Sequence, residues 1–258
     1  MNLLKKYTLI TGASSGFGEQ FALNYAQQQH NLILVARSAG KLETLASELR
    51  ANYNISVVVI PMDLSQLDAA EQLFQVCQKQ QLDINFLINN AGLGSVGPFE
   101  NEDIARTQEM MIVNMLSLTK LTHYFLPQLK LNQGKILNVG SQAGFQGVPY
   151  MASYAATKAY VLHFSEALNY ELEKSGVKVM VLAPGATHTN FFTAANSSLD
   201  KTRLITQTSD VVVKTAMRGV AKNKLVIVTS VINKLLNFGT RFIPRRLVLK
   251  IAAYFMRE

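Results

Sequence analysis

The sequence predicts an α/β fold, a doubly wound parallel sheet with helices on both faces, in a single domain. Short runs in which nearly every residue is apolar alternate with longer segments of helical periodicity from residue 6 to about residue 182. Continuous apolar runs are typical of parallel strands buried on both faces, and the alternation is typical of repeated β-α-β units. The composition agrees, because 258 residues that are 48% hydrophobic and 16% charged can bury a large core.

The first strand leads into a glycine-rich turn. The run Lys6–Thr11 is followed at once by GASSGFG and then by a helical pattern. Glycine permits positive φ and close approach of the backbone to a ligand, while a helix N-terminus offers free N–H groups to a pyrophosphate. Although the spacing is G-x-x-x-G-x-G, not G-x-G-x-x-G, the strand–turn–helix context predicts a Rossmann-type dinucleotide site. The turn residues expected there are Gly12, Ser14, Ser15, Gly16, Phe17 and Gly18.

The end of the second strand indicates which dinucleotide binds. This strand, Asn31–Arg37, ends in a cation, and no acidic residue follows it before Glu43. An acidic side chain at this point would hold the free 2′-hydroxyl of NAD, whereas an arginine can accommodate the 2′-phosphate of NADP. The sequence therefore predicts NADP(H), with Arg37 as a cofactor-binding residue.

The remaining elements continue the alternation. Helices are expected at about residues 40–50, 66–80, 101–130 and 152–174, and another from Ser209 onward. Ligands of open α/β sheets bind beyond the carboxyl ends of the strands, so the residues that follow each strand are candidates for the site. The expected strands are Ser56–Pro61, Asn85–Asn89, Gly134–Gly140, Val177–Leu182 and Lys224–Thr229.

A tyrosine and a lysine lie four residues apart in the segment SYAATK. On a helix, Tyr154 and Lys158 would lie one turn apart on the same face, and the residues between them are small. A neighbouring cation favours the phenolate, so we expect the pKa of Tyr154 to be lowered from its ordinary value of about 10. Ser141 follows the fifth strand and could bind a substrate oxygen.

In these features the chain resembles the classical short-chain dehydrogenase/reductase family over about residues 6–190. Each motif alone is weak, but together they occur in order and at the expected strand ends. The matching segments are Thr11–Gly18, Asp63-Leu64, Asn89–Gly92, Asn114, Ser141, Tyr154-x-x-x-Lys158 and Pro184-Gly185.

The resemblance implies a role for each matching residue. Tyr154 would be the general acid, or the base in the reverse direction, and Ser141 would bind the substrate oxygen. Lys158 would hold the nicotinamide ribose and lower the pKa of the tyrosine. Asn114, in mid-helix, would disturb the helical ladder and hold a water for proton relay; a solvent-facing asparagine is the alternative. The further residues implied to bind cofactor are Asp63, Leu64, Asn90, Ala91, Gly92, Pro184, Gly185, Thr187 and Thr189.

Two other chemistries are disfavoured. Ser141 is not flanked by a G-x-S-x-G nucleophile elbow, which argues against a hydrolase triad with His163 or His188. The histidines show no metal-ligand spacing, and Cys77 is the only cysteine, so we predict no metal and no internal disulfide. A single buried thiol fits a reducing, cytoplasmic setting.

After residue 189 the family pattern loosens. The polar segment at about 190–210 is predicted to be a lid that, with residues 142–151, walls the substrate pocket. Aromatic and aliphatic residues in these segments favour a lipophilic ketone or aldehyde over a sugar. The expected pocket residues are Phe145, Val148, Tyr150, Phe191 and Phe192.

The C-terminal segment carries the positive charge. Residues 201–258 hold twelve of the 25 Lys and Arg but two of the 17 Asp and Glu. We assign residues 1–230 to the catalytic domain and 231–258 to a basic amphipathic extension, whose final helix starts near Pro244. Its basic face could meet an anionic membrane, or its apolar face could pack on the protein itself or on a sister subunit. No nucleic-acid motif accompanies the charge.

The sequence thus predicts an NADP-dependent oxidoreductase that interconverts a carbonyl and an alcohol. The alternatives are an oxoacyl-thioester reductase of the same family and a non-catalytic NADP(H)-sensing protein. Because the glycine turn begins at Gly12 and no run of about 18 apolar residues occurs, we expect neither a signal peptide nor a spanning helix. By analogy with the family, a homodimer or homotetramer is expected through the helices at 101–130 and 152–174.

Overall fold

A parallel sheet of seven strands forms the centre of the protein. The computed structural model describes residues 5–188, 206–240 and 242–256. The strands lie in the order β3-β2-β1-β4-β5-β6-β9, and every neighbouring pair is parallel. Chain order reverses between β1 and β4, which makes their carboxyl ends the switch point of the sheet. The strands are β1 (Lys6–Thr11), β2 (Asn31–Ala36), β3 (Val57–Pro61), β4 (Asp83–Asn89), β5 (Lys135–Val139), β6 (Lys178–Ala183) and β9 (Val226–Val228).

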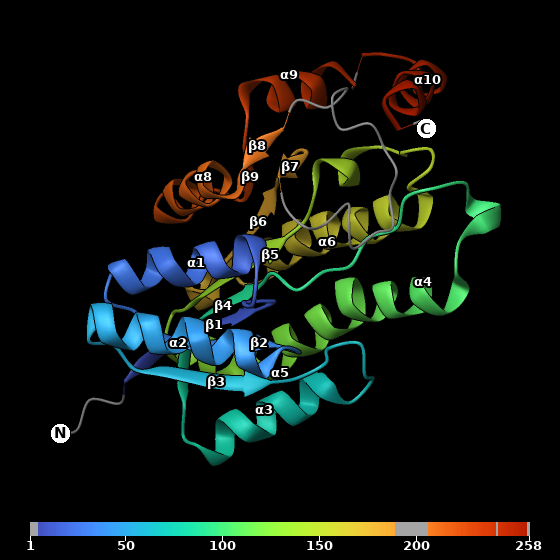
Figure 1. The fold of residues 1–258 in the computed structure, drawn as a ribbon. Helices are drawn as coiled ribbons and strands as arrows, with labels where there is room; N and C mark the ends of the chain where they lie inside the picture. The colour runs from blue at the N-terminus through green and yellow to red at the C-terminus, as the bar shows by residue number, and fades with distance from the viewer. Residues whose placement is uncertain (1–4, 189–205, 241, 257–258) are drawn as a thin grey trace.

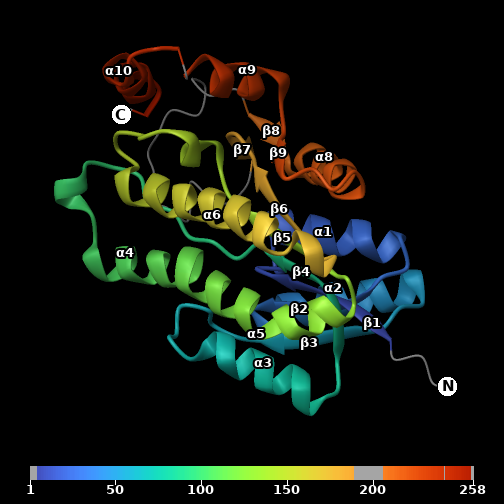
Figure 2. The ribbon, with the colours of Figure 1, turned by 180° about the vertical axis from the view of Figure 1, so that it is seen from behind.

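Helices cover both faces of this sheet (Figures 1 and 2). Successive strand residues point to opposite faces, so Ile10 and Leu34 join one apolar cluster while Leu9 and Ile33 join the other. The first cluster packs under α1 (Gly16–Gln27), α2 (Ala39–Tyr53) and α8 (Ser209–Ala221); the second packs under α3 (Ala69–Lys79) and α5 (Leu118–Leu131). The long helix α6 (Ala152–Glu171) lies beside α5 on the second face. The predicted doubly wound fold is therefore confirmed.

The helix predicted over about 101–130 is present as one unbroken helical run from Ile104 to Leu131, and its ladder is disturbed around Asn114, as the family resemblance implied. The chain forms α4 (Ile104–Met111), a π-helical segment (Ile112–Ser117) and then α5. Asp103 caps the start of α4, where its carboxylate accepts the N–H groups of Ala105 and Arg106. π-helical turns are rare and occur frequently at functional sites, and this one contains Asn114.

The C-terminal segment contains the predicted final helix, α10 (Arg245–Met256), which begins one residue after Pro244. A helix before it, α9 (Val231–Gly239), was not predicted. Both lie together beyond one end of the sheet, away from the N-terminus (Figures 1 and 2). Neither contains a buried residue, in contrast to the other α-helices. Within the described ranges, no helix is both long and apolar enough to cross a bilayer.

Short elements complete the fold. A small parallel pair, β7 (Thr187–His188) and β8 (Gln207–Thr208), was not predicted. Most of the predicted lid at 190–210 lies outside the described residues, and its last part forms β8 and the start of α8. Single 3-10 turns occur at Phe99–Asn101, Gln142–Phe145 and Glu173–Ser175.

Candidate active site

A cavity of about 840 Å³ opens at the carboxyl ends of the strands. It runs from the glycine turn after β1, past the ends of β4 and β5, to the face of α6. The predicted residues on its wall are Gly12, Ser14, Ser15, Gly16, Phe17, Arg37, Asp63, Leu64, Asn90, Ala91, Gly92, Ser141, Tyr154, Lys158, Pro184, Gly185 and Thr187. Gly18 and Asn114 lie behind that wall, and Thr189 lies outside the described residues.

The glycine turn needs its glycines for two reasons. Gly12 and Gly16 have φ values of +66° and +60°, which side chains rarely adopt. Gly18 instead packs against the turn itself, because a Cβ there would lie 2.1 Å from the carbonyl oxygen of Gly12. The turn is thus folded tightly onto the N-terminal end of α1.

Asn90 and Thr11 fasten this turn to β4. The Asn90 amide donates to the carbonyl oxygens of Thr11 (2.9 Å) and Gly12 (3.2 Å). The Thr11 hydroxyl accepts the N–H groups of Asn90 and Ala91, both at 3.0 Å. Sequence reasoning gave Thr11 no such role, because a threonine at the end of a strand looks like an ordinary strand residue.

Two cations line the cavity beyond the second strand. Arg37 and Lys41 both lie on its wall, with Ser38 between them and Asp63 at the end of β3. Asp63 accepts the N–H and the hydroxyl of Ser65 at 3.0 and 2.9 Å. Lys41 was missed, although a lysine one helical turn after Arg37 is a readable signal.

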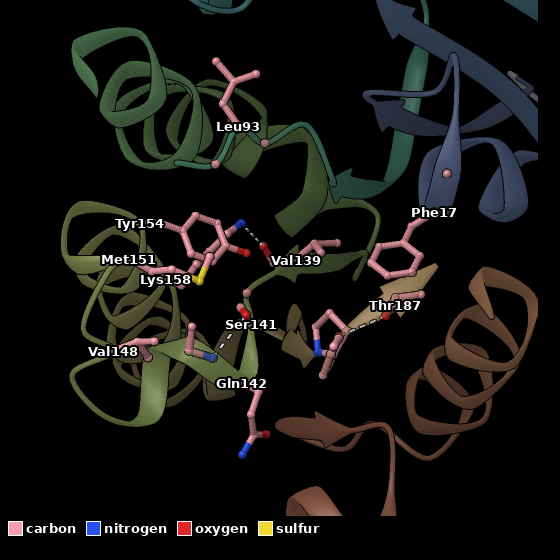
Figure 3. A pocket seen from close by; sticks show the side chains of 18 of the residues that line it. Phe17, Leu93, Val139, Ser141, Gln142, Val148, Met151, Tyr154, Lys158 and Thr187 are labelled. Atoms are coloured by element: carbon pink, nitrogen blue, oxygen red, sulfur yellow. Dashed lines mark hydrogen bonds between the residues drawn. The ribbon is translucent and has the colours of Figure 1, made fainter. Parts of the chain in front are cut away.

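At the other end of the cavity, α6 presents Tyr154 and Lys158. Figure 3 shows both side chains beside Ser141, with Phe17 and Thr187 across the cavity. The ammonium of Lys158 donates to the carbonyl oxygen of Val139 at 2.8 Å and lies 5.8 Å from the centre of the Tyr154 ring. Ser141 follows β5, and its hydroxyl accepts the N–H of Ala143 at 3.1 Å. The three residues predicted to act together therefore lie together.

Burial changes the acidity of this pair in directions that the sequence did not predict. Desolvation raises the pKa of the Tyr154 phenol to about 12, although a hydrogen bond with the Ser141 side chain acts in the lowering direction. Desolvation also lowers the pKa of Lys158 to about 8. The expectation of a lowered tyrosine pKa is wrong for this site, because the loss of solvation outweighs the hydrogen bond with Ser141.

Asn114 is buried, which rules out the solvent-facing alternative. Its side chain is 1% exposed and holds the backbone of Leu93 on both sides: Oδ1 accepts the Leu93 N–H and Nδ2 donates to the Leu93 carbonyl, each at 2.9 Å. Nδ2 also donates to the hydroxyl of Thr157 at 2.9 Å. Asn114 thus ties the loop after β4 to α6, behind Gly92 and Lys158.

Apolar side chains of α9 and α10 form the far wall of the cavity. The sequence did not place these helices there. Gln142 links the active-site loop to α9, because its amide donates to the Asn237 side chain and to the carbonyl of Asn233. The α9 and α10 residues on this wall include Ile232, Leu235, Leu236, Val248, Ile251, Ala252, Phe255 and Met256.

The predicted substrate pocket is only partly correct. Val148 lines the cavity, whereas Phe145 points elsewhere and packs against Leu118 and Val161. Tyr150 is not among the described lining residues, and Phe191 and Phe192 lie outside the described ranges. Two amide oxygens facing this region, on Gln142 and Gln146, are buried and accept no hydrogen bond from the described residues.

No group of three or more His, Cys, Asp or Glu residues in the described ranges is arranged as a metal would require.

Comparison with known proteins gives one family. The family model for short chain dehydrogenases matches residues 6–200. The chain is 33% identical over 193 residues to a 7beta-hydroxysteroid dehydrogenase of Clostridium sardiniense, covering 73% of each protein. It is 36% identical over 182 residues to a very-long-chain 3-oxoacyl-CoA reductase of Coccidioides immitis; the match covers 68% of this chain and 52% of that relative, so the chain spans about half of its length.

Comparison with solved structures indicates the same family. A short-chain dehydrogenase from Sphingobium yanoikuyae in complex with NADPH superposes with a TM-score of 0.83 at 32% identity, over 93% of this chain and 94% of that one.

Proposed function

The chain belongs to the short chain dehydrogenase family and is an oxidoreductase of that family. We propose that it reduces a bulky lipophilic ketone with NADPH. The observation that carries the proposal is the convergence of Ser141, Tyr154 and Lys158 on one cavity that begins at the glycine turn. A protein that only senses the cofactor has no need of a buried proton donor at the far end.

The cavity fits a dinucleotide. The residues of the glycine turn line the cavity, and Gly12 packs so closely on the loop after β4 that an added Cβ would lie 2.9 Å from Ala91 and Asn90. The first N–H groups of α1 can bind a pyrophosphate there, since a helix N-terminus favours anions. Nicotinamide dinucleotides supply or accept the hydride. The residues that we propose to hold the cofactor are the predicted wall residues together with Lys41, while Thr11, Gly18 and Asn114 support them from behind.

NADP(H) is favoured over NAD(H) by the charge near the second strand. Arg37 and Lys41 both line the cavity and could share a 2′-phosphate. The relative from Sphingobium yanoikuyae binds NADPH. Arg37→Ala should therefore weaken NADPH binding at least tenfold and leave NADH binding nearly unchanged, whereas Lys222→Ala, at the exposed end of α8, should affect neither. An equal loss for both cofactors would refute the assignment.

Tyr154 can act as the proton donor in reduction. A phenol with a pKa near 12 keeps its proton at neutral pH and can donate it to a carbonyl oxygen that gains charge. Ser141 can hold that oxygen, because its hydroxyl lies at the end of β5 beside the phenol. Lys158 binds Val139 on its other side, which fixes its ammonium beneath the tyrosine. Asn114 holds Leu93, and through it the wall next to Lys158.

The substrate side favours a large apolar molecule that carries a polar group. Residues of α9 and α10 supply an apolar wall, while Gln142 and Gln146 offer buried acceptors to a hydroxyl. The similarity to a 7beta-hydroxysteroid dehydrogenase supports this class.

A panel of carbonyl substrates tests the proposal. NADPH consumption should be measured with a steroid ketone, a short aliphatic ketone and a keto sugar. The steroid ketone should give the highest kcat/KM. A preference for the sugar would refute the lipophilic class, and no turnover of any carbonyl would favour the cofactor-sensing alternative.

A second candidate is an oxoacyl-thioester reductase. The 36% identity to a very-long-chain 3-oxoacyl-CoA reductase favours it, as does the excess of basic residues in the C-terminal segment. Including a long-chain 3-oxoacyl-CoA in the panel separates the two candidates, because each predicts a different best substrate.

Self-association is proposed through α4–α6. These helices expose three large hydrophobic side chains, those of Met111, Leu116 and Tyr160. The rings of Tyr160 and Phe164 also stack at the surface, with their centres 5.7 Å apart. Light scattering of the full chain should give the mass of a dimer or tetramer; a monomer would refute the proposal.

A further inference from the structure

The outer side of α9 carries an uncovered apolar stripe. Val231, Leu235 and Phe238 recur at helical spacing on α9, and Phe242 follows the end of the helix; the four residues are 69%, 65%, 61% and 74% exposed. The rings of Phe238 and Phe242 contact each other at 5.2 Å, edge to face. We call these four residues the α9 stripe. Such an exposed row of large apolar side chains indicates an interaction site.

The apolar face of α10 is used differently. Val248, Ile251 and Phe255 line the cavity, and Met256 packs near Met151 and Tyr154. The apolar residues of the final helix therefore face the cavity, and Met256 alone of these four joins a core cluster. On α9, Ile232 and Leu236 likewise line the cavity, and Leu235 belongs both to the cavity wall and to the α9 stripe, so the stripe adjoins the cavity.

Positive charge surrounds the α9 stripe. Lys234 lies on α9 itself, and Arg245, Arg246 and Lys250 lie on the neighbouring helix; all four are exposed. The sequence from Val231 to Met256 contains no Asp or Glu. Exposed apolar side chains bordered by cations match the boundary of an anionic bilayer, where the apolar groups enter the acyl region and the cations meet headgroup phosphates.

We propose that the α9 stripe and its flanking cations dock the enzyme on an anionic membrane surface. A second copy of the chain fits this surface less well, because a two-fold contact would set the stripe and its cations against the same cations without an acidic partner. A soluble acidic carrier would pair with the cations but leave large aromatic groups in water. In this docked position the wall formed by α9 and α10 would face the lipid, and an apolar substrate could pass from the bilayer to the cavity. Only this passage of substrate rests on the proposed function; the docking itself does not.

Vesicle flotation of the full chain tests the docking. Vesicles of phosphatidylcholine alone are compared with vesicles that also contain phosphatidylglycerol. The wild type should float with the anionic vesicles, and raised salt should weaken the binding. The double variant Phe238→Ser, Phe242→Ser should bind at least tenfold more weakly, and so should Lys234→Glu, Arg246→Glu. The matched control is Leu131→Ser, which changes an apolar residue that is 88% exposed at the end of α5.

Folding and chemistry are checked separately. None of the substituted residues lines the cavity, so the variants should keep the wild-type melting temperature and the turnover of a water-soluble ketone. Flotation needs neither cofactor nor substrate, so its failure and the failure of the proposed function are distinguishable.

Three results would overturn the proposal. One is that the wild type and the phenylalanine double variant float equally with the anionic vesicles, or that neither of them floats. Another is a wild-type dimer that dissociates in the double variant without any vesicle binding, which would assign the α9 stripe to a second copy. The third is binding to an acidic acyl carrier protein but not to vesicles.

Discussion

The two ends of the cavity are built in different ways. Around the glycine turn, backbone meets backbone: Gly18 packs on the carbonyl of Gly12, and the Asn90 amide bonds to the same turn. At the far wall, α9 and α10 have no buried residue. We therefore expect substitutions to be tolerated less easily at the glycine turn than at the far wall. Substitutions at the far wall are expected to alter the choice of substrate first.

The largest expected effect is the loss of the proton donor on α6, which lies outside both of these regions. Tyr154→Phe removes the hydroxyl and keeps the ring, so kcat/KM for a ketone should fall about 10²- to 10⁴-fold. NADPH binding and melting temperature should change little. Tyr160→Phe, on the same helix, is the matched control, because its hydroxyl contacts Thr119 at the surface. If both variants keep activity, Tyr154 is not the donor.

The next effect compares two glycines, one at each end. Gly18→Ala places a Cβ 2.1 Å from a backbone oxygen that cannot move away, so we expect a loss of roughly 1–3 kcal/mol in the free energy of unfolding. Gly185→Ala places a Cβ 2.3 Å from the Asn233 amide, which is a side-chain end that can rotate. Its cost should stay below about 1 kcal/mol.

Urea unfolding of both variants measures this contrast. Gly40→Ala serves as the control, because no atom lies within 4 Å of the added Cβ, and it should stabilise α2 by about 0.5–1 kcal/mol. If Gly185→Ala were as destabilising as Gly18→Ala, the C-terminal wall would be as rigid as the glycine turn, and the distinction between the two ends would fail.

The same contrast explains what the sequence could predict. Continuous apolar strands and a glycine turn are local patterns, so Lys6–Thr11 and Gly12–Gly18 could be identified directly. The packing of Phe145 and of α10 could not, because an amphipathic pattern does not say which neighbour covers its apolar face.

Two features of the site itself depend on the folded structure. Although the resemblance implied that Asn114 would disturb its helix, the sequence could not show that its side chain bonds to the backbone of Leu93, which is distant in the chain. The raised pKa of Tyr154 depends on burial, whereas the sequence shows only that a cation lies one turn away.

Burial of Lys158 should give the stability of the protein a pH dependence. Its pKa falls from the ordinary 10.5 to about 8 on folding, so between about pH 8 and 10.5 the unfolded chain binds a proton that the folded chain has released. Stability from this group therefore rises with pH across that window. The raised pKa of Tyr154 acts oppositely, lowering stability between about pH 10 and 12.

Comparison with Lys158→Met isolates this contribution. Relative to that variant, the wild type should gain stability between pH 8 and 10 in urea unfolding. Lys79→Met, which changes an exposed lysine of α3, should track the wild type at every pH. A constant difference between the wild type and Lys158→Met would mean that Lys158 keeps its ordinary pKa in the folded protein.

The smallest effect is expected at the far wall, and it should appear in specificity before stability. Ile251 and Leu247 both lie on α10 and are 46% and 48% exposed, but only Ile251 lines the cavity. Ile251→Ala should raise KM for a bulky ketone about three- to tenfold, since each buried methylene contributes roughly 0.8 kcal/mol and this side chain is half exposed. Leu247→Ala should leave KM unchanged. Both variants should unfold within about 1 kcal/mol of the wild type, because neither removes a buried side chain. A loss of stability confined to Ile251→Ala would instead make α10 part of the core, and an equal rise in KM for small and bulky ketones would remove it from substrate selection.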